Sequence, residues 1–124
     1  MKKYILIFIF LFLYCLCAEG KENTLPPEHL IYGVPYESQP AGSSYCGEAS
    51  LYMIVHYWDE KSTVTQEYLI KELFSPLFDS TFPYAIEHYL ASKGFTVVTD
   101  RSGNIETVKQ YVCQDIPVLV VNSI

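Results

Sequence analysis

The clearest hydrophobic pattern along the chain lies between residues 46 and 58. Apolar side chains recur there at steps of three and four positions, at Leu51, Ile54, Val55 and Trp58. An α-helix turns once in about 3.6 residues, so this spacing gathers the apolar side chains on one face. The pattern predicts a helix that begins near Cys46 and packs along its length.

Three further segments carry local signals that mark where a helix begins or ends. The segment 63–74 starts with a capping box formed by Thr63 and Gln66. Thr65 is a competing N-cap. The segment 83–93 starts with a proline suited to the first turn, and a glycine that favours a left-handed cap follows it. Asn104 is expected to cap a helix over residues 105–113. These signals bring the number of predicted helices to four.

Three short segments have strand character: 30–36, 95–99 and 117–121. The first contains a glycine and a proline, which suits the margin of a sheet. The second is rich in β-branched residues, and the third is apolar throughout, as a strand buried on both faces would be. Together with the helices, these strands predict an α+β fold with an antiparallel sheet. The sheet is expected to be incomplete, because three residues follow the last strand and leave it without neighbours.

The first twenty residues have the layout of a secretory signal peptide. A positively charged start is followed by an apolar run over residues 4–16 and by small residues at Ala18 and Gly20. The run is shorter than the roughly 20 residues of a transmembrane helix, so an uncleaved membrane anchor is the alternative. Bulky residues before Cys15 and Cys17 disfavour a lipid-anchored cysteine. The protein is therefore expected to be secreted or periplasmic.

The predicted cleavage divides the chain into a signal peptide (1–20), a linker (21–29) and one domain (30–124). The full chain has 124 residues and a formal net charge of −6. Its length fits a single domain, and its acidic balance excludes a general nucleic-acid binder, which needs clustered Lys and Arg. The domain keeps Cys46 and Cys113, which are too few for a zinc site. A disulfide between them is an alternative to two free thiols. No metal or cofactor is expected.

The strongest chemical signal is the run Tyr-Cys-Gly-Glu-Ala-Ser at 45–50, which opens the first predicted helix. A thiol at a helix N-terminus faces unpaired backbone N–H groups and the positive end of the helix dipole, and both stabilise the thiolate. Gly47 leaves room for a substrate backbone, whereas Glu48 is expected to be an ordinary exposed charge. Gln39, upstream in a loop, can donate to an oxyanion together with the backbone N–H of Cys46. A buried structural cysteine is the alternative.

An ordered set of motifs makes the sequence resemble a papain-like cysteine peptidase. The motifs are Val-Pro-Tyr-Glu-Ser-Gln at 34–39, Cys-Gly-Glu-Ala-Ser at 46–50, Lys-Gly-Phe at 93–95 and Ile-Pro-Val-Leu-Val at 116–120. The sequence is most similar to the bacteriocin-processing, or double-glycine leader, peptidase family and its stand-alone secreted relatives (family thirty-nine of the cysteine peptidases). The resemblance spans about residues 30–121.

The resemblance implies a papain-like fold, a nucleophilic Cys46 and an oxyanion-hole Gln39 that act on a peptide or protein. It also implies a His that acts as base and an Asp or Asn that orients this His. In the family, the His follows the strand that residues 117–121 match, whereas here three residues remain after that strand. A second departure is the spacing from Gln39 to Cys46, which is one position longer than is usual in papain-like enzymes.

None of the three histidines is a convincing base for Cys46. His56 lies further along the same helix, at about 15 Å for a rise of 1.5 Å per residue, which is beyond hydrogen-bond reach. His29 falls in the predicted linker, and nothing in the sequence places His88 near the thiol. Each is expected to be a surface histidine or a satisfied one.

The sequence therefore predicts a secreted cysteine-peptidase-like protein that is inactive as given, because the His and the Asp or Asn of the family are missing. Two alternatives stay open. One is a non-catalytic module that binds peptides or proteins on a peptidase scaffold. The other is a protein whose missing strands come from a partner chain. Contact with a membrane is expected only if the N-terminal segment is not cleaved.

Overall fold

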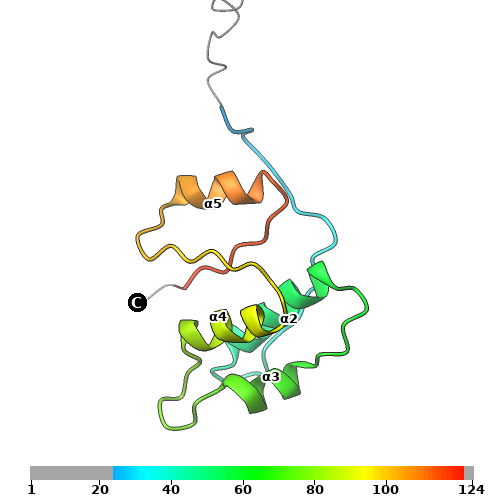
Figure 1. Cartoon of the computed structure of the whole chain (residues 1–124), viewed down its shortest axis with the longest axis vertical. Coiled ribbons are helices and arrows are strands. Elements are labelled where there is room, and N and C mark those ends of the chain that lie inside the picture. The colour runs from blue at the N-terminus through cyan, green and yellow to red at the C-terminus, as the bar shows by residue number, and fades with distance from the viewer. Residues whose placement is uncertain (1–23, 122–124) are drawn as a thin grey trace, which may run out of the picture.

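The computed structural model describes residues 24–121, so the predicted signal peptide lies outside the described residues. Four helices follow one another in this part: α2 (Cys46–Trp58), α3 (Gln66–Leu73), α4 (Pro83–Ser92) and α5 (Ile105–Val112). Helices α2, α3 and α4 form one group, and α5 lies apart from it, beyond the segments that precede and follow α5 (Figure 1). None of these helices is long and apolar enough to cross a membrane.

The starts of α3 and α5 follow the capping residues of the sequence. The Thr65 side chain accepts a hydrogen bond of 3.2 Å from the backbone N–H of Tyr68, so α3 begins at Gln66 and the competing N-cap is the real one. Asn104 Oδ1 accepts a bond of 3.0 Å from the N–H of Thr107 at the start of α5, as predicted. The starts of α3 and α5 are thus each fixed by a side chain within one turn, whereas the N-cap residues of α2 and α4 make no side-chain capping bond.

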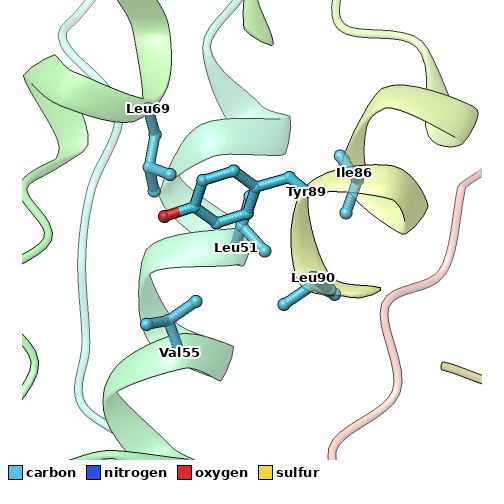
Figure 2. Close-up of a cluster of buried hydrophobic side chains, with 6 residues drawn as sticks. All are labelled: Leu51, Val55, Leu69, Ile86, Tyr89 and Leu90. Atoms are coloured by element: carbon cyan, nitrogen blue, oxygen red, sulfur yellow. The ribbon is translucent and has the colours of Figure 1, made fainter. Parts of the chain in front are cut away.

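The core lies between α2, α3 and α4, and each of the three helices contributes to it (Figure 2). It consists of the buried side chains Leu51, Val55, Leu69, Ile86, Tyr89 and Leu90. The ring of Tyr89 reaches from α4 across to α3, so one aromatic side chain joins the two helices (Figure 2). The predicted apolar stripe of α2 is only partly buried, because Trp58 at the helix end is 53% exposed.

The three predicted strands, 30–36, 95–99 and 117–121, are not formed in the part of the chain that the structure describes. A strand requires a neighbour that accepts and donates its backbone hydrogen bonds. These segments have no such ladder, and the isolated bridge between Ser75 and Ser80 is the β pairing found between residues 24 and 121. Between residues 24 and 121, the helical part of the predicted fold is therefore present, and the predicted sheet is not formed.

Two of these segments are nevertheless held against the helices. The backbone N–H of Phe95 donates to Leu90 O at 3.1 Å, and that of Ile116 donates to Tyr111 O at 3.1 Å. The side chains of Phe95 and Leu119 pack against the core, while Val120 is 66% exposed. Each segment therefore starts from a helix C-terminus and runs on in an extended form without a backbone partner.

Candidate active site

Cys46 is the first residue of α2, and its thiol is free and exposed. Tyr45 is the N-cap residue, and its side chain makes no capping hydrogen bond. The first intrahelical bond of α2 runs from Ala49 N–H to Tyr45 O at 3.1 Å. The first-turn amides of α2 therefore receive no hydrogen-bond acceptor from the N-cap side chain.

Glu48, two residues after the thiol, is fully buried at 0% exposure, although the sequence suggested an ordinary exposed charge. Thr81 Oγ1 donates a hydrogen bond to Glu48 Oε1. Glu48 Oε2 is also buried, and no partner for it is found in the described part of the chain. The positive end of the helix dipole favours a carboxylate in this first turn. Glu48 thus joins α2 to the loop before α4.

Gly47 allows a close contact between the start of α2 and the start of α4. A Cβ atom on Gly47 would lie 3.3 Å from Thr81 Cβ and 3.6 Å from Ile86 Cδ1. Carbon atoms are optimally about 3.5–4.0 Å apart, so a larger residue would push Thr81 away. The glycine therefore has a packing role inside the protein, besides any room that it leaves for a substrate.

The loop over residues 74–82 covers the start of α2 through three contacts. Ser44 Oγ donates to Asp79 Oδ2 at 3.0 Å, on the N-terminal side of the thiol. The rings of Tyr45 and Phe74 meet edge to face, with centroids 4.7 Å apart. With the bond between Thr81 and Glu48, these contacts fix the residues on both sides of Cys46. Local sequence signals cannot reveal this support, because the two residues of each contact are at least 29 positions apart.

Gln39 lies exposed in the loop before α2. The loop is tied to α3, because Gln66 Nε2 donates to the backbone carbonyl of Ser38 at 3.2 Å. Gln39 therefore lies in the loop that leads into α2, and no hydrogen bond between it and Cys46 is found among residues 24–121.

The three histidines are engaged elsewhere or lie on the surface. His56 Nε2 bonds to the backbone carbonyl of Val64 at 2.8 Å, between the end of α2 and the loop before α3. His88 is exposed on α4, whose residues at 86, 89 and 90 are buried instead. Within residues 24–121, no histidine makes a hydrogen bond to Cys46.

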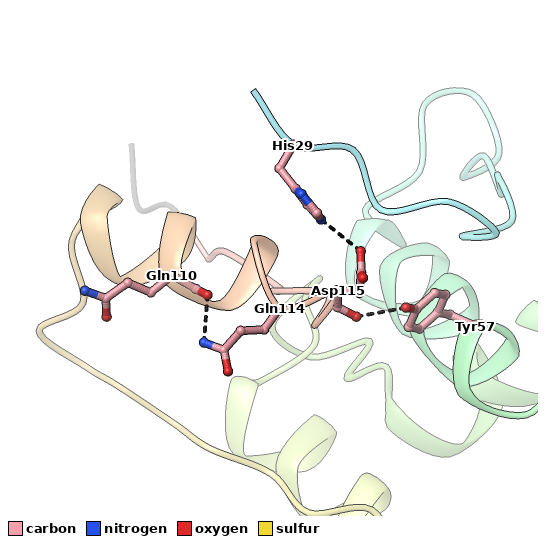
Figure 3. Close-up of polar contacts among 5 residues, drawn as sticks. All are labelled: His29, Tyr57, Gln110, Gln114 and Asp115. Atoms are coloured by element: carbon pink, nitrogen blue, oxygen red, sulfur yellow. Dashed lines mark hydrogen bonds and ion pairs between the residues drawn. The ribbon is translucent and has the colours of Figure 1, made fainter. Parts of the chain in front are cut away.

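His29, in the predicted linker, contacts the residues that follow α5 (Figure 3). Its Nε2 lies 2.8 Å from Oδ1 of Asp115, which has a left-handed backbone with φ of 58°. The backbone carbonyl of Asp115 also accepts a bond of 2.8 Å from the Tyr57 hydroxyl. Asp115, which follows α5, therefore joins the segment before the domain to the end of α2.

Cys113 lies in this second region and not beside Cys46. It lines a groove of about 690 Å³ between residues 24–29 and α5, together with His29. Cys113 is half-buried, and both cysteines of the described chain are free thiols, so no disulfide joins them. The described residues also hold no group of three or more His, Cys, Asp or Glu side chains that could bind a metal ion.

The comparison with protein families decides the relationship of this chain. A family model described as "Peptidase_C39 like family" matches residues 31–124, which is most of the sequence. The chain belongs to the Peptidase_C39 like family. This membership confirms the resemblance to cysteine peptidases and indicates a papain-like fold. No curated protein and no solved structure matches the chain significantly.

The match to the Peptidase_C39 like family includes the main parts of the candidate site. Gln39, Cys46 and the 74–82 loop all lie within residues 31–124. His29 lies outside the match, and so does the rest of the segment that lines the groove with α5. The match therefore includes the region around α2, α5 and Asp115, and it does not include His29.

Proposed function

We propose that this protein is a secreted, cysteine-peptidase-like member of its family in which Cys46 is the nucleophile. The observation that carries the proposal is the exposed, free thiol at the start of α2. The N-cap side chain there accepts no hydrogen bond from the first-turn amides. A buried structural cysteine, the alternative, would not need this exposure. Gln39 is the proposed oxyanion-hole donor, since it precedes the same helix end.

The proposed chemistry is acyl transfer. Cys46 Sγ attacks the carbonyl carbon of a peptide bond, and the oxyanion is stabilised by the Gln39 amide and the backbone N–H of Cys46. The C–N bond then breaks, the amine leaves with a proton, and a thioester to Cys46 remains. Water hydrolyses the thioester, which releases the carboxylic acid and the free thiol.

We further propose that the 124-residue chain hydrolyses peptides little or not at all. The support is that His29 bonds to Asp115, His56 bonds to Val64 and His88 is exposed on α4. A base must come within hydrogen-bond reach of the thiol to take its proton. Peptide hydrolysis by the purified chain that Cys46→Ala abolishes would contradict this part of the proposal.

The nucleophile is tested with iodoacetamide, which reports thiolate reactivity without needing a base in the protein. Cys46 is expected to be alkylated faster than the half-buried Cys113, by about tenfold or more, because the helix end stabilises its thiolate. Peptide mass mapping of the wild type and of Cys46→Ser and Cys113→Ser separates the two sites. Equal and slow labelling of both cysteines would overturn the nucleophile.

A second candidate function is a non-catalytic module that binds a partner chain through the extended segments. The observation that favours it is that residues 95–99 and 117–121 expose Val98 and Val120 at 68% and 66% and have no backbone ladder. An extended segment with unpaired backbone groups accepts a strand from another chain readily. Hydrogen exchange tests this candidate, because a partner strand would slow exchange at both segments, and unchanged exchange with every partner offered would reject it.

Export is proposed from the signal-peptide layout of the N-terminus. Intact mass analysis of protein expressed with its N-terminus in a secreting host tests it. The mass is expected to lack residues 1–20, whereas a full-length, membrane-associated product would indicate the uncleaved anchor.

A further inference from the structure

The loop over residues 38–44, which leads into α2, is held at both of its ends by bonds to other parts of the protein. At its start, the side chain of Gln66, the first residue of α3, donates from Nε2 to the backbone carbonyl of Ser38 at 3.2 Å. At its end, Ser44 Oγ donates to Asp79 Oδ2 at 3.0 Å. The chain that enters the candidate active site is therefore held by side chains from two distant segments.

Between these two bonds, the loop closes a tight turn over residues 40–43. The backbone N–H and the hydroxyl of Ser43 both donate to the carbonyl of Pro40, at 3.1 and 2.6 Å. Gly42 has a φ of 75°, the left-handed conformation that the third residue of a type II turn adopts. The turn brings its ends together, so it shortens the path from the proposed oxyanion donor to the nucleophile, where this chain is one position longer than is usual in papain-like enzymes.

The bond from Gln66 reaches Gln39 through the peptide unit between Ser38 and Gln39. The carbonyl of Ser38 and the backbone N–H of Gln39 lie in one plane, so a donor that binds this carbonyl fixes the plane from which the Gln39 residue continues. Gln66 is half-buried and stands in the first turn of a helix that Thr65 caps. Gln39 is exposed, and within residues 24–121 its side chain makes no hydrogen bond of its own. The bond next to Gln39 is therefore the one that holds it.

We infer that Gln66 is a positioning residue for the oxyanion donor Gln39. It does not touch the substrate, and it acts by holding the peptide unit before Gln39, so that this side chain starts from one fixed place in the loop. Donors that are fixed in advance stabilise an oxyanion best, because they need no rearrangement during the reaction. The inference rests on the proposed function, since it takes Cys46 as the nucleophile and Gln39 as the donor.

The test compares two reagents on Cys46 in a Cys113→Ser background. With p-nitrophenyl acetate, the sulfur bonds to the acetyl carbon, the carbonyl oxygen becomes an oxyanion, and the ester C–O bond then breaks. The p-nitrophenolate leaves with the electron pair, and solvent takes the thiol proton. Iodoacetamide is instead attacked at its CH₂ carbon and loses iodide, so no oxyanion forms. The ratio of the acylation rate to the alkylation rate therefore reports oxyanion stabilisation apart from thiol reactivity.

Gln39→Ala is expected to lower this ratio by about tenfold or more, as the loss of an oxyanion donor does. Gln66→Ala is expected to lower it by at least about threefold. Gln66→Glu should do the same, because an ionised carboxylate keeps the shape of the side chain but has no N–H to donate. Gln114→Ala is the matched control and should leave the ratio unchanged, since Gln114 Nε2 likewise donates to a backbone carbonyl, that of Gln110, at 2.8 Å (Figure 3).

The possible failures are distinguishable. A ratio that falls in Gln39→Ala but in neither Gln66 variant overturns the positioning role and leaves the proposed function standing. A ratio that stays unchanged even in Gln39→Ala rejects this residue as the donor, and the role of Gln66 with it. If iodoacetamide labels Cys46 no faster than free cysteine, the nucleophile is wrong and both roles fall. Circular dichroism confirms that the variants are folded.

Discussion

Two regions of this molecule differ in how their elements are stabilised. The group α2–α4 holds the core, and helix α5 contains no buried residue. The extended segments beside α5 likewise lack a backbone ladder within residues 24–121. A helix satisfies its backbone groups within its own segment, whereas a strand needs another strand. The comparison teaches that the candidate nucleophile stands on the better-packed region, whereas the extended segments have no backbone partner within residues 24–121.

The largest expected effect comes from truncating a core leucine. Leu51→Ala and Leu69→Ala remove fully buried side chains and are expected to lower the free energy of unfolding by about 2–5 kcal/mol each. Val120→Ala, at a 66% exposed position, is expected to change it by less than about 0.5 kcal/mol. Urea denaturation followed by circular dichroism measures all three. Equal losses would mean that the two regions are packed alike.

The hydrogen bond from Thr81 to the buried Glu48 sharpens the comparison. Thr81→Val keeps the shape of the side chain but leaves the buried Glu48 carboxylate without its donor, and about 1–3 kcal/mol of stability is expected to be lost. Adding Glu48→Met should recover most of this loss, because both polar partners are then removed. Thr99→Val, exposed in the extended region, is the control. If the double variant unfolds as readily as Thr81→Val, the contact is not the cause of the loss.

The two N-caps allow the same chemical change to be made in each region. Thr65→Ala is expected to lower the global stability by about 1 kcal/mol, because α3 carries the buried Leu69. Asn104→Ala should instead fray α5 locally, since no residue of that helix is buried. Hydrogen exchange at residues 105–112, combined with the urea midpoint, separates the two results. A shifted midpoint in Asn104→Ala would tie α5 to the core.

The smallest effect is confined to alkaline pH. Burial raises the pKa of the Tyr89 hydroxyl above its ordinary value of 10.0, and Tyr68 and Glu72 add to the rise. The folded state therefore holds this proton more tightly than the unfolded state. The corresponding stability is complete below about pH 10 and is lost as the pH rises through the folded pKa.

Tyr89→Phe is expected to remove this alkaline loss and to leave the stability near pH 7 almost unchanged, since the buried hydroxyl has no partner in the described structure. Tyr32→Phe, at an 81% exposed position, should not alter the alkaline behaviour. Urea midpoints at pH 7 and at pH 11 give the comparison. The same alkaline loss in wild type and Tyr89→Phe would assign it to another group.

The helices were predictable from sequence because their signals are local. The helix predicted from Cys46 to Trp58 has those bounds in the structure, and Thr65 and Asn104 start α3 and α5 through bonds within one turn. The strands were not predictable in this way. Apolar, β-branched composition at 117–121 favours an extended backbone, but pairing depends on segments distant in the chain.

The burial of Glu48 was missed although the sequence held a signal for it. Glu48 precedes Leu51 by three positions and Val55 by seven, so it extends the apolar face of α2. The pair of His29 and Asp115 had no comparable signal, because 86 positions separate the two residues.

The contacts of Thr81 also bear on how this site can change over generations. Its methyl-bearing carbon lies against Gly47, and its hydroxyl is bonded to Glu48. A larger residue at position 81 would collide with the helix start, and a residue without a hydroxyl would leave a buried acid unpaired. Positions 47, 48 and 81 are therefore expected to vary together during the descent of the family, as one inherited unit beside the thiol.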